Sequence, residues 1–271
     1  MSVTLGAGAV DEAATLFLQA RRTGLPIPSL PASCRPAGAA DVNAIVEAVT
    51  AALLAEDGER ICGWKIGFLY APRQPPMICP LFASRTFSSP AAVPLALTPS
   101  LRIEPEVSFI LLADLPARTR AYRPDEVAEV LAACPSLEIV DTRFDTRVRS
   151  IRQMLDDKSG RLEAMADHNT TGAYITGKPV AAWQQLDFAS MHAVMHQGGR
   201  KLVETVGGHA FTDPFLPCVV LANLMRHQDG LKAGQLLVTG SFSGFFEAVP
   251  DLPVTAEFDG LGSAQATFTT C

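Results

Sequence analysis

From residue 61 onward, apolar residues come in short runs interrupted by glycine and proline, and this pattern predicts a mostly β fold. The candidate strands cover residues 61–68, 92–97, 101–114, 136–140, 171–175, 188–195, 201–205, 236–239, 254–258 and 263–268. Gln197-Gly-Gly-Arg predicts a hairpin turn between two of these strands, and Asp259-Gly260 predicts the turn of a final hairpin.

Helical spacing of apolar residues predicts helices at 11–23 and 41–55, joined by a proline-rich connection. Further helices are expected at 125–134, where Pro135 would end the helix, and from 214 to about 227, capped by Thr212 or Asp213. Residues 71–80 resemble a loop, and 141–167 a partly helical wall or lid. We therefore expect an α+β protein with a small N-terminal helical subdomain at 1–60 and a β-rich domain at 61–271.

Composition excludes several classes of partner. The net charge is -6 and there is no basic run, which argues against nucleic acid. The weak basic cluster at 143–152 is interrupted by Asp145, so we interpret it as a solvent-exposed face. No basic leader and no membrane-length apolar stretch is evident, so we expect no membrane partner and a cytoplasmic location. The 6 cysteines form no Cys-x-x-Cys pair and are expected to be reduced.

The strand expected at 101–114 carries two carboxylates into an apolar region. Side chains alternate along a strand, so Glu104 and Glu106 share a face, which Ser108, Ile110 and Leu112 should continue inward. Burying a charge is costly unless a cation or strong donors compensate it. The chain should therefore supply a compensating group.

Glu138 and Lys65 extend this anomaly, because both lie within other predicted interior strands. Three carboxylates and one ammonium leave an excess of two negative charges, which an Mg²⁺ or Mn²⁺ ion would balance. These hard cations prefer oxygen ligands and keep open positions for a chelating substrate. The residues thus predict a metal site at Glu104, Glu106 and Glu138 with Lys65 beside it.

Other candidate sites are weaker. His192 and His196 are four apart on a predicted strand, roughly 13 Å at the usual rise, which is too far to chelate one ion. His209 follows two glycines and could approach a ligand, although a surface role is the simpler interpretation. His168, beside Asp167, is a better candidate for lining a pocket. Backbone amides around Thr239, Gly240 and Ser241 could bind an anion such as a carboxylate. No phosphate loop, dinucleotide fingerprint or nucleophile elbow is present.

Five stretches resemble, in order, the motifs of the fumarylacetoacetate hydrolase superfamily, and the resemblance covers nearly the whole chain. They are Gly63-Trp-Lys-Ile-Gly, Arg102-Ile-Glu-Pro-Glu, Leu137-Glu-Ile-Val-Asp, Ala166-Asp-His-Asn-Thr-Thr-Gly and Leu231-Lys-Ala-Gly-Gln-Leu-Leu-Val-Thr-Gly-Ser. Within the superfamily, the chain most resembles the branch of 2-keto-4-pentenoate hydratases and 4-oxalocrotonate decarboxylases, which share an Ala-Arg-Arg-Thr-Gly-like helix end, here residues 20–24.

The resemblance implies a β-rich catalytic body, with mixed sheets forming a roll, and a divalent ion held by the three glutamates. It also implies that Lys65 projects into the site, with Asp167, Thr239 and Ser241 near the substrate. We expect Lys65, Asp167 and His168 to be catalytic. Substrate binding is expected from Arg102, Thr239, Gly240 and Ser241.

The activity that this resemblance implies is metal-dependent hydration of a 2-hydroxy-2,4-dienoate in aromatic catabolism. The alternatives are decarboxylation of a 4-oxalocrotonate-type 2-oxo acid, hydrolysis of a carbon–carbon bond in an acylpyruvate, or binding of a 2-oxo acid without catalysis. A homo-oligomer is expected, and association with a partner enzyme of the pathway is considered. Three departures from the family pattern leave the exact substrate open. These are Asp167-His168 for Asp-Asn, Thr212-Asp213-Pro214 for Gly-His-Pro, and Phe68-Leu69-Tyr70 after the first motif.

Overall fold

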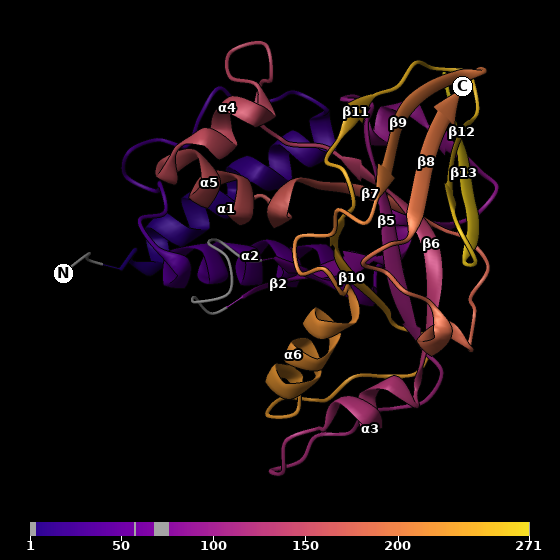
Figure 1. Ribbon diagram of the computed structural model, residues 1–271. Coiled ribbons are helices and arrows are strands. Elements are labelled where there is room, and N and C mark those ends of the chain that lie inside the picture. Colours follow the sequence, from indigo (N-terminus) through magenta and orange to yellow (C-terminus); the bar gives the residue numbers. More distant parts are fainter. Residues whose placement is uncertain (1–3, 57, 68–75, 271) are drawn as a thin grey trace. The chain divides into compact units, whose positions relative to one another are not determined.

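The computed structural model describes residues 4–56, 58–67 and 76–270 of the chain (Figure 1). The chain divides into two compact units, each described here by itself. The first unit comprises Met1–Arg60, Phe68–Cys79 and Asp141–Thr171. The second comprises Ile61–Gly67, Pro80–Val140 and Gly172–Cys271.

The first unit is helical. Its helices are α1 (Ala7–Thr23), α2 (Ala39–Leu54), α4 (Ile151–Asp156) and α5 (Lys158–Ala166). Phe17 of α1 and Ile45 of α2 are fully buried in a shared apolar core. Helix α1 begins four residues before the predicted cap, because Gly6 takes the N-cap position, and it ends at Gly24 with a left-handed φ of 69°. No helix in the described part of the chain is long and apolar enough to cross a membrane.

The helical unit is not made of residues 1–60 alone. Ala164, Met165 and Ala166 of α5 belong to the same buried core as the N-terminal helices. The helical unit also includes Asp141–Thr171, of which residues 141–167 were expected to form a partly helical wall or lid. Helical spacing predicted the N-terminal helices but not this long-range packing.

Most of the second unit is two β-sheets (Figure 1). Among the described residues, the larger sheet has 8 strands in the order β2-β1-β10-β5-β6-β7-β3, with β11 also paired to β5. Their bounds are β1 (Ile61–Gly67), β2 (Met77–Phe82), β3 (Thr86–Ser88), β5 (Arg102–Leu111), β6 (Leu131–Val140), β7 (Thr171–Thr176), β10 (Leu236–Ser241) and β11 (Phe246–Glu247). Cys62 of β1 and Thr86 of β3 lie 3.2 Å apart (Sγ to Oγ1), so the sheet curls until strands distant in its order meet.

The smaller sheet has 5 described strands in the order β4-β13-β12-β8-β9. They are β4 (Ala91–Pro94), β8 (His192–Gln197), β9 (Arg200–Val206), β12 (Val254–Phe258) and β13 (Gly262–Thr269). Both predicted hairpins are present, β8 with β9 and β12 with β13. Helices α3 (Pro124–Ala128) and α6 (Phe215–Met225) complete the unit.

The two faces of β5 differ in chemistry. Ile103, Val107 and Phe109 point to one side and are fully buried, and the Phe109 ring packs edge-on against Trp183 at 5.1 Å between centroids. This aromatic packing anchors β5 in the core. The residues that alternate with them, beginning at Glu104, face the interior of the curled sheet.

Several predicted elements were wrong. The helix expected at 125–134 stops at Ala128, and β6 begins at Leu131 and continues through Pro135. All of β6 is buried, and such a strand shows a continuous apolar run that cannot be distinguished from a helix by periodicity. Strand β5 ends at Leu111, so Leu112 is 55% exposed rather than inward. The loop expected at 71–80 contains the start of β2, while residues 71–75 lie outside the described residues.

Candidate metal centre and active site

The pairing of β5 with β6 determines where the acidic side chains meet. The two strands are antiparallel, with Glu104 opposite Glu138 and Glu106 opposite Ser136. Residues directly opposite one another share a face of the sheet. The predicted alternation along β5 therefore places both of its carboxylates on the face that carries Glu138.

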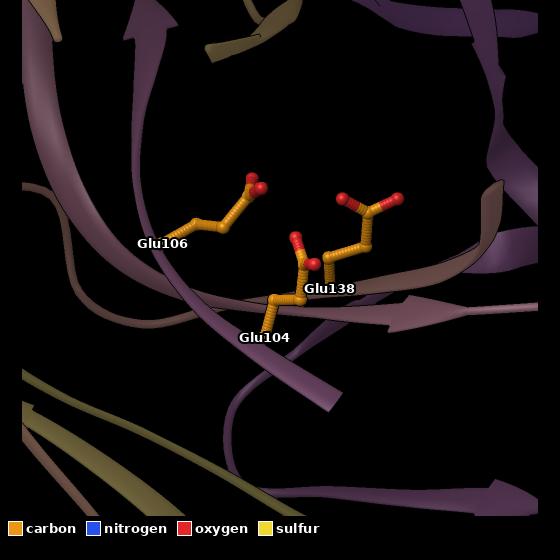
Figure 2. Close-up of side chains that lie close together, drawn as sticks. All are labelled: Glu104, Glu106 and Glu138. Atoms are coloured by element: carbon orange, nitrogen blue, oxygen red, sulfur yellow. The ribbon is translucent and has the colours of Figure 1, made fainter. Parts of the chain in front are cut away.

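The three carboxylates converge (Figure 2). One oxygen from each of Glu104, Glu106 and Glu138 lies within 4.8 Å of the others. Glu106 and Glu138 are fully buried, and Glu104 is half-buried. The cluster is thus sealed on one side and accessible from the other.

Lys65 is the cation of this cluster. On β1 it lies beside Val238 of β10, which in turn lies opposite Ser108 of β5. Its Nζ donates to Glu138 Oε1 at 2.5 Å. Gly63, two residues before Lys65, allows β1 to approach β10 closely. A Cβ at this position would lie 2.2 Å from the Leu236 carbonyl oxygen.

Burial and mutual repulsion shift the pKa values within the cluster. Burial, and then the negative charge of Glu138, raises the pKa of Glu106 well above its ordinary value. Burial alone would lower the pKa of Lys65, but the charges of Glu138, Glu106 and Glu104 outweigh it and raise that pKa. The carboxylates repel one another more than a single ammonium can compensate.

The cluster fits a hard divalent cation. Neither oxygen of Glu106, nor Oε2 of Glu138, has a hydrogen-bond partner among the described residues, although all three atoms are buried. Buried polar atoms normally have hydrogen-bond partners. Carboxylate oxygens that converge without such partners therefore indicate a site that can bind a cation. A donor set made only of carboxylate oxygens is typical of Mg²⁺, Mn²⁺ or Ca²⁺ and not of a thiolate-binding metal.

The candidate anion-binding segment lies at the end of β10. Ser241 lies opposite Glu106 across the β10–β5 pairing, after an irregularity that includes Gly240, whose φ is 120°. The Ser241 hydroxyl accepts hydrogen bonds from the backbone amides of Ser243 and Gly244, at 3.1 and 2.9 Å. Thr239 is buried, and its carbonyl accepts from His209 Nε2 at 3.1 Å. Burial lowers the pKa of His209, so this imidazole is a neutral donor that fixes the segment.

Arg102 is the predicted substrate-binding residue at the other end of the acidic row. It lies two residues before Glu104 on β5 and therefore shares that face. Its guanidinium is mostly buried and forms a long ion pair, at 3.9 Å, with the exposed Glu247. An ion pair with an exposed partner at this distance contributes little stability.

Asp167 and His168 belong to the first unit, where Arg143 binds Asp167. Arg143 Nε donates to Asp167 Oδ1 at 2.6 Å, while the Arg143 amide and the Thr142 hydroxyl donate to Oδ2 at 2.7 and 2.8 Å. The prediction that residues 143–152 form a solvent-exposed face was therefore wrong for Arg143, which is 7% exposed. Arg147, which is 83% exposed, does fit that prediction.

The turn that follows Asp167 is strained. His168, Asn169 and Thr170 have φ values of 50°, 52° and 54°, and a left-handed helical conformation costs roughly 1–2 kcal/mol per non-glycine residue. The buried His168 Nε2 lies 3.2 Å from the Thr50 hydroxyl. Burial, with the charges of Arg21 and Arg143, holds its pKa well below the usual range. Such strain is often found at functional sites.

Sequence reasoning missed two buried residues. Arg143 was hidden within a charged stretch, and only its position three residues after a fully buried strand distinguishes it. Tyr174 lies on β7 and is 1% exposed. The signal for Tyr174 was a single polar group in the apolar run Gly-Ala-Tyr-Ile.

Two solved structures of one protein share this fold over nearly the whole chain. No family model matches the chain. The structure superposes on 4-oxalocrotonate decarboxylase from Pseudomonas putida G7, complexed with calcium and acetate, with a TM-score of 0.78 over 98% of this chain and 100% of that chain at 20% identity. The same decarboxylase complexed with magnesium and adipate also gives a TM-score of 0.78, at 19% identity. The α+β fold predicted from the superfamily motifs is confirmed.

Curated relatives indicate the branch. The chain is 26% identical to 2-keto-4-pentenoate hydratase from Burkholderia vietnamiensis over 259 residues, which cover 93% of this chain and 94% of that protein. It is 25% identical to 4-oxalocrotonate decarboxylase from Pseudomonas putida over 168 residues, 62% of this chain and 60% of that protein. The resemblance to the hydratase and decarboxylase branch is thereby confirmed.

Proposed function

We propose that the chain is a divalent-metal-dependent hydratase that adds water to a 2-hydroxy-2,4-dienoate of the 2-keto-4-pentenoate type in aromatic catabolism. The observation that carries the proposal is the convergence of Glu104, Glu106 and Glu138 beside Lys65. Both oxygens of Glu106 and Oε2 of Glu138 are buried and lack a hydrogen-bond partner among the described residues. Similarity to hydratases over nearly the full length of the chain supports hydration as the reaction.

Each residue of the cluster has a proposed role. The three glutamates would hold Mg²⁺ or Mn²⁺, and the bound ion would supply Lewis-acid stabilisation of negative charge on the 2-oxygen of the substrate. Lys65 would carry the proton that converts the dienol into the unsaturated ketone. Arg102 and the backbone from Thr239 to Ser241 would orient the carboxylate of the substrate.

Water activation is assigned to Asp167 and His168 as a prediction. Burial and the charges of Arg21 and Arg143 lower the pKa of His168 and keep its imidazole neutral, and the strained turn that carries it is a feature often found at functional sites. The contacts of Asp167 with Arg143 and Thr142 favour a supporting role for that carboxylate. A cytoplasmic homo-oligomer, acting with or without a partner enzyme of the same pathway, completes the proposal.

Decarboxylation is the second candidate function, favoured by the fold similarity to 4-oxalocrotonate decarboxylase over the whole chain. It would use the same stabilisation of negative charge, with carbon dioxide leaving instead of water adding. The acylpyruvate hydrolase and the non-catalytic binding protein remain alternatives. The first normally needs a His and Glu pair near the first motif, and residues 71–80 contain neither type.

The purified protein with Mg²⁺ should bleach the dienol ultraviolet absorbance of 2-hydroxypentadienoate without releasing carbon dioxide. Release of carbon dioxide from 4-oxalocrotonate would instead select the decarboxylase. Binding of oxalate or pyruvate without turnover of either substrate would select the binding protein. Addition of EDTA should abolish turnover, and restoring Mg²⁺ or Mn²⁺ should recover it; activity that persists in EDTA would contradict the metal dependence.

Replacing Lys65 with Met should lower kcat by roughly 100- to 10,000-fold, which is the usual range for loss of a positioned proton carrier. Affinity for Mn²⁺ should be unchanged or tighter, because the ammonium now shares Glu138 Oε1 with any bound cation. Steady-state kinetics and Mn²⁺ titration measure the two effects. Lys201→Met, at a half-exposed lysine on β9, is the matched control. Full activity in Lys65→Met would exclude Lys65 as the proton carrier.

A further inference from the structure

Tyr174 is a buried tyrosine that the proposed chemistry does not use. Its ring packs with Cys134, Leu236 and Val238 inside the curled sheet. Its hydroxyl is buried, and the structure shows no hydrogen-bond partner for it among the described residues. A buried phenol normally finds a partner, so this hydroxyl needs an explanation.

Tyr174 of β7 and Glu138 of β6 face the same side of the sheet. The two strands are neighbours, and Gly177 donates its amide to the Pro135 carbonyl at 2.7 Å. Tyr174 packs against Cys134 of β6. Cys134 lies four residues before Glu138, so these two side chains share a face of β6.

Glu104 lies opposite Glu138 on the other neighbour of β6 and shares its face. Glu104, Glu138 and Tyr174 thus come from three adjacent strands and point to one side of the sheet. The phenol therefore faces the same interior as the acidic cluster.

The two groups are chemically complementary. Burial, followed by the negative charges of Glu138 and Glu106, raises the pKa of Tyr174 well above its ordinary value, so the phenol carries its proton near neutral pH. Glu138 Oε1 already accepts from Lys65, whereas Oε2 has no partner in the described part of the chain. A phenol donor and a carboxylate acceptor thus lie on the same face of neighbouring strands.

We propose that Tyr174 is a positioning residue of the metal centre: its phenol donates a hydrogen bond to Glu138 and, with Lys65, fixes the orientation in which that carboxylate binds a divalent cation. The inference rests on the proposed metal site and adds a residue to its outer shell. Hydrogen-bond partners of metal-binding carboxylates typically change metal affinity by roughly 10- to 100-fold.

Mn²⁺ binding without substrate, followed by electron paramagnetic resonance, tests the proposal in Tyr174→Phe. We expect affinity to fall by about 10-fold or more. Tyr122→Phe is the matched control, because it removes the same atom from a hydroxyl that donates to the Pro116 carbonyl at 2.5 Å. In EDTA, Tyr122→Phe should lower the midpoint of thermal unfolding, since it breaks a hydrogen bond. Tyr122→Phe should leave the affinity for Mn²⁺ at the wild-type value, because the Tyr122 hydroxyl donates to Pro116 and not to a residue of the acidic cluster.

Wild-type affinity in Tyr174→Phe, within about two-fold, would overturn the positioning role and leave the metal site intact. A wild-type protein that binds no Mn²⁺ would overturn the proposed site, and this inference with it. If Tyr174→Phe does not fold, the ultraviolet difference spectrum decides. Adding Mg²⁺ should perturb a tyrosine band in the wild type and in Tyr122→Phe alike, and an unperturbed spectrum would overturn the proposal.

Discussion

Glu106→Gln should abolish divalent metal binding and turnover while making the metal-free protein more stable. Both oxygens of Glu106 are buried without a hydrogen-bond partner among the described residues, and repulsion from Glu138 outweighs the attraction of Lys65. The amide removes that charge at nearly constant volume. Affinity for Mn²⁺ should fall by more than the roughly 100-fold that loss of an outer-shell partner can reach, and titration calorimetry measures it.

The stability gain has a defined pH dependence. The folded protein holds the pKa of Glu106 well above the ordinary value of 4.5, so the folded state binds this proton more tightly than the unfolded chain. The destabilisation is absent below pH 4.5, grows as the pH rises above it, and is complete above the raised folded-state pKa. Urea unfolding in EDTA should therefore show Glu106→Gln to be more stable than wild type at neutral pH and not at pH 4.

Glu257→Gln provides the control for this substitution. Glu257 is exposed on β12, so the same chemical change there should alter neither metal affinity nor the pH dependence of unfolding. A Glu106→Gln protein that binds Mn²⁺ as tightly as wild type would contradict the metal site. Unchanged metal-free stability would contradict the repulsion within the cluster.

Asp167→Asn should destabilise the helical unit by about 3–5 kcal/mol, the usual result of removing one partner of a buried ion pair. Asp167 is fully buried, and Arg143 is 7% exposed. The same guanidinium also donates to the backbone carbonyls of Asp167 and Thr171, so it holds both ends of the strained turn. Denaturant unfolding, followed by helical circular dichroism, should show the loss at neutral pH.

Asp125→Asn is the control for a surface pair. Asp125 and its partner Arg123 are 60% and 59% exposed, and such pairs contribute about 0–1 kcal/mol. If Asp167→Asn unfolds like wild type but loses turnover, Asp167 acts in the chemistry and not in the structure. If it loses stability and keeps kcat in the folded fraction, the catalytic assignment of Asp167 is wrong.

The acidic cluster could be predicted from the sequence because strand alternation is strict. Glu104 and Glu106 are two residues apart, so any strand there places both on one face, and Glu138 repeats the same anomaly of charge in an apolar run. Lys65 could be predicted for the same reason. The superfamily motifs then gave the order of the elements around these residues.

The packing of the long segment after β6 could not be predicted in this way. Asp141–Thr171 joins the N-terminal helices through apolar residues that are far away in sequence, and no local pattern encodes that distance. The ion pair of Arg143 with Asp167 spans 24 residues. The error at 125–134 has a different cause, because a fully buried strand lacks the alternation by which strands are recognised.

Strands β5 and β6 pair continuously, from Arg102 opposite Val140 to Leu111 opposite Leu131. This pairing determines the face of the sheet on which the acidic side chains lie. A slip of one residue between these strands would turn every acidic side chain to the opposite face, so a chain that folds at all assembles its carboxylates. Among the residues proposed to bind the substrate, Arg102 lies within this pairing, whereas Thr239, Gly240 and Ser241 lie outside it on β10. Substitutions at residues 239–241 could therefore change which substrate is bound while the three carboxylates keep their positions.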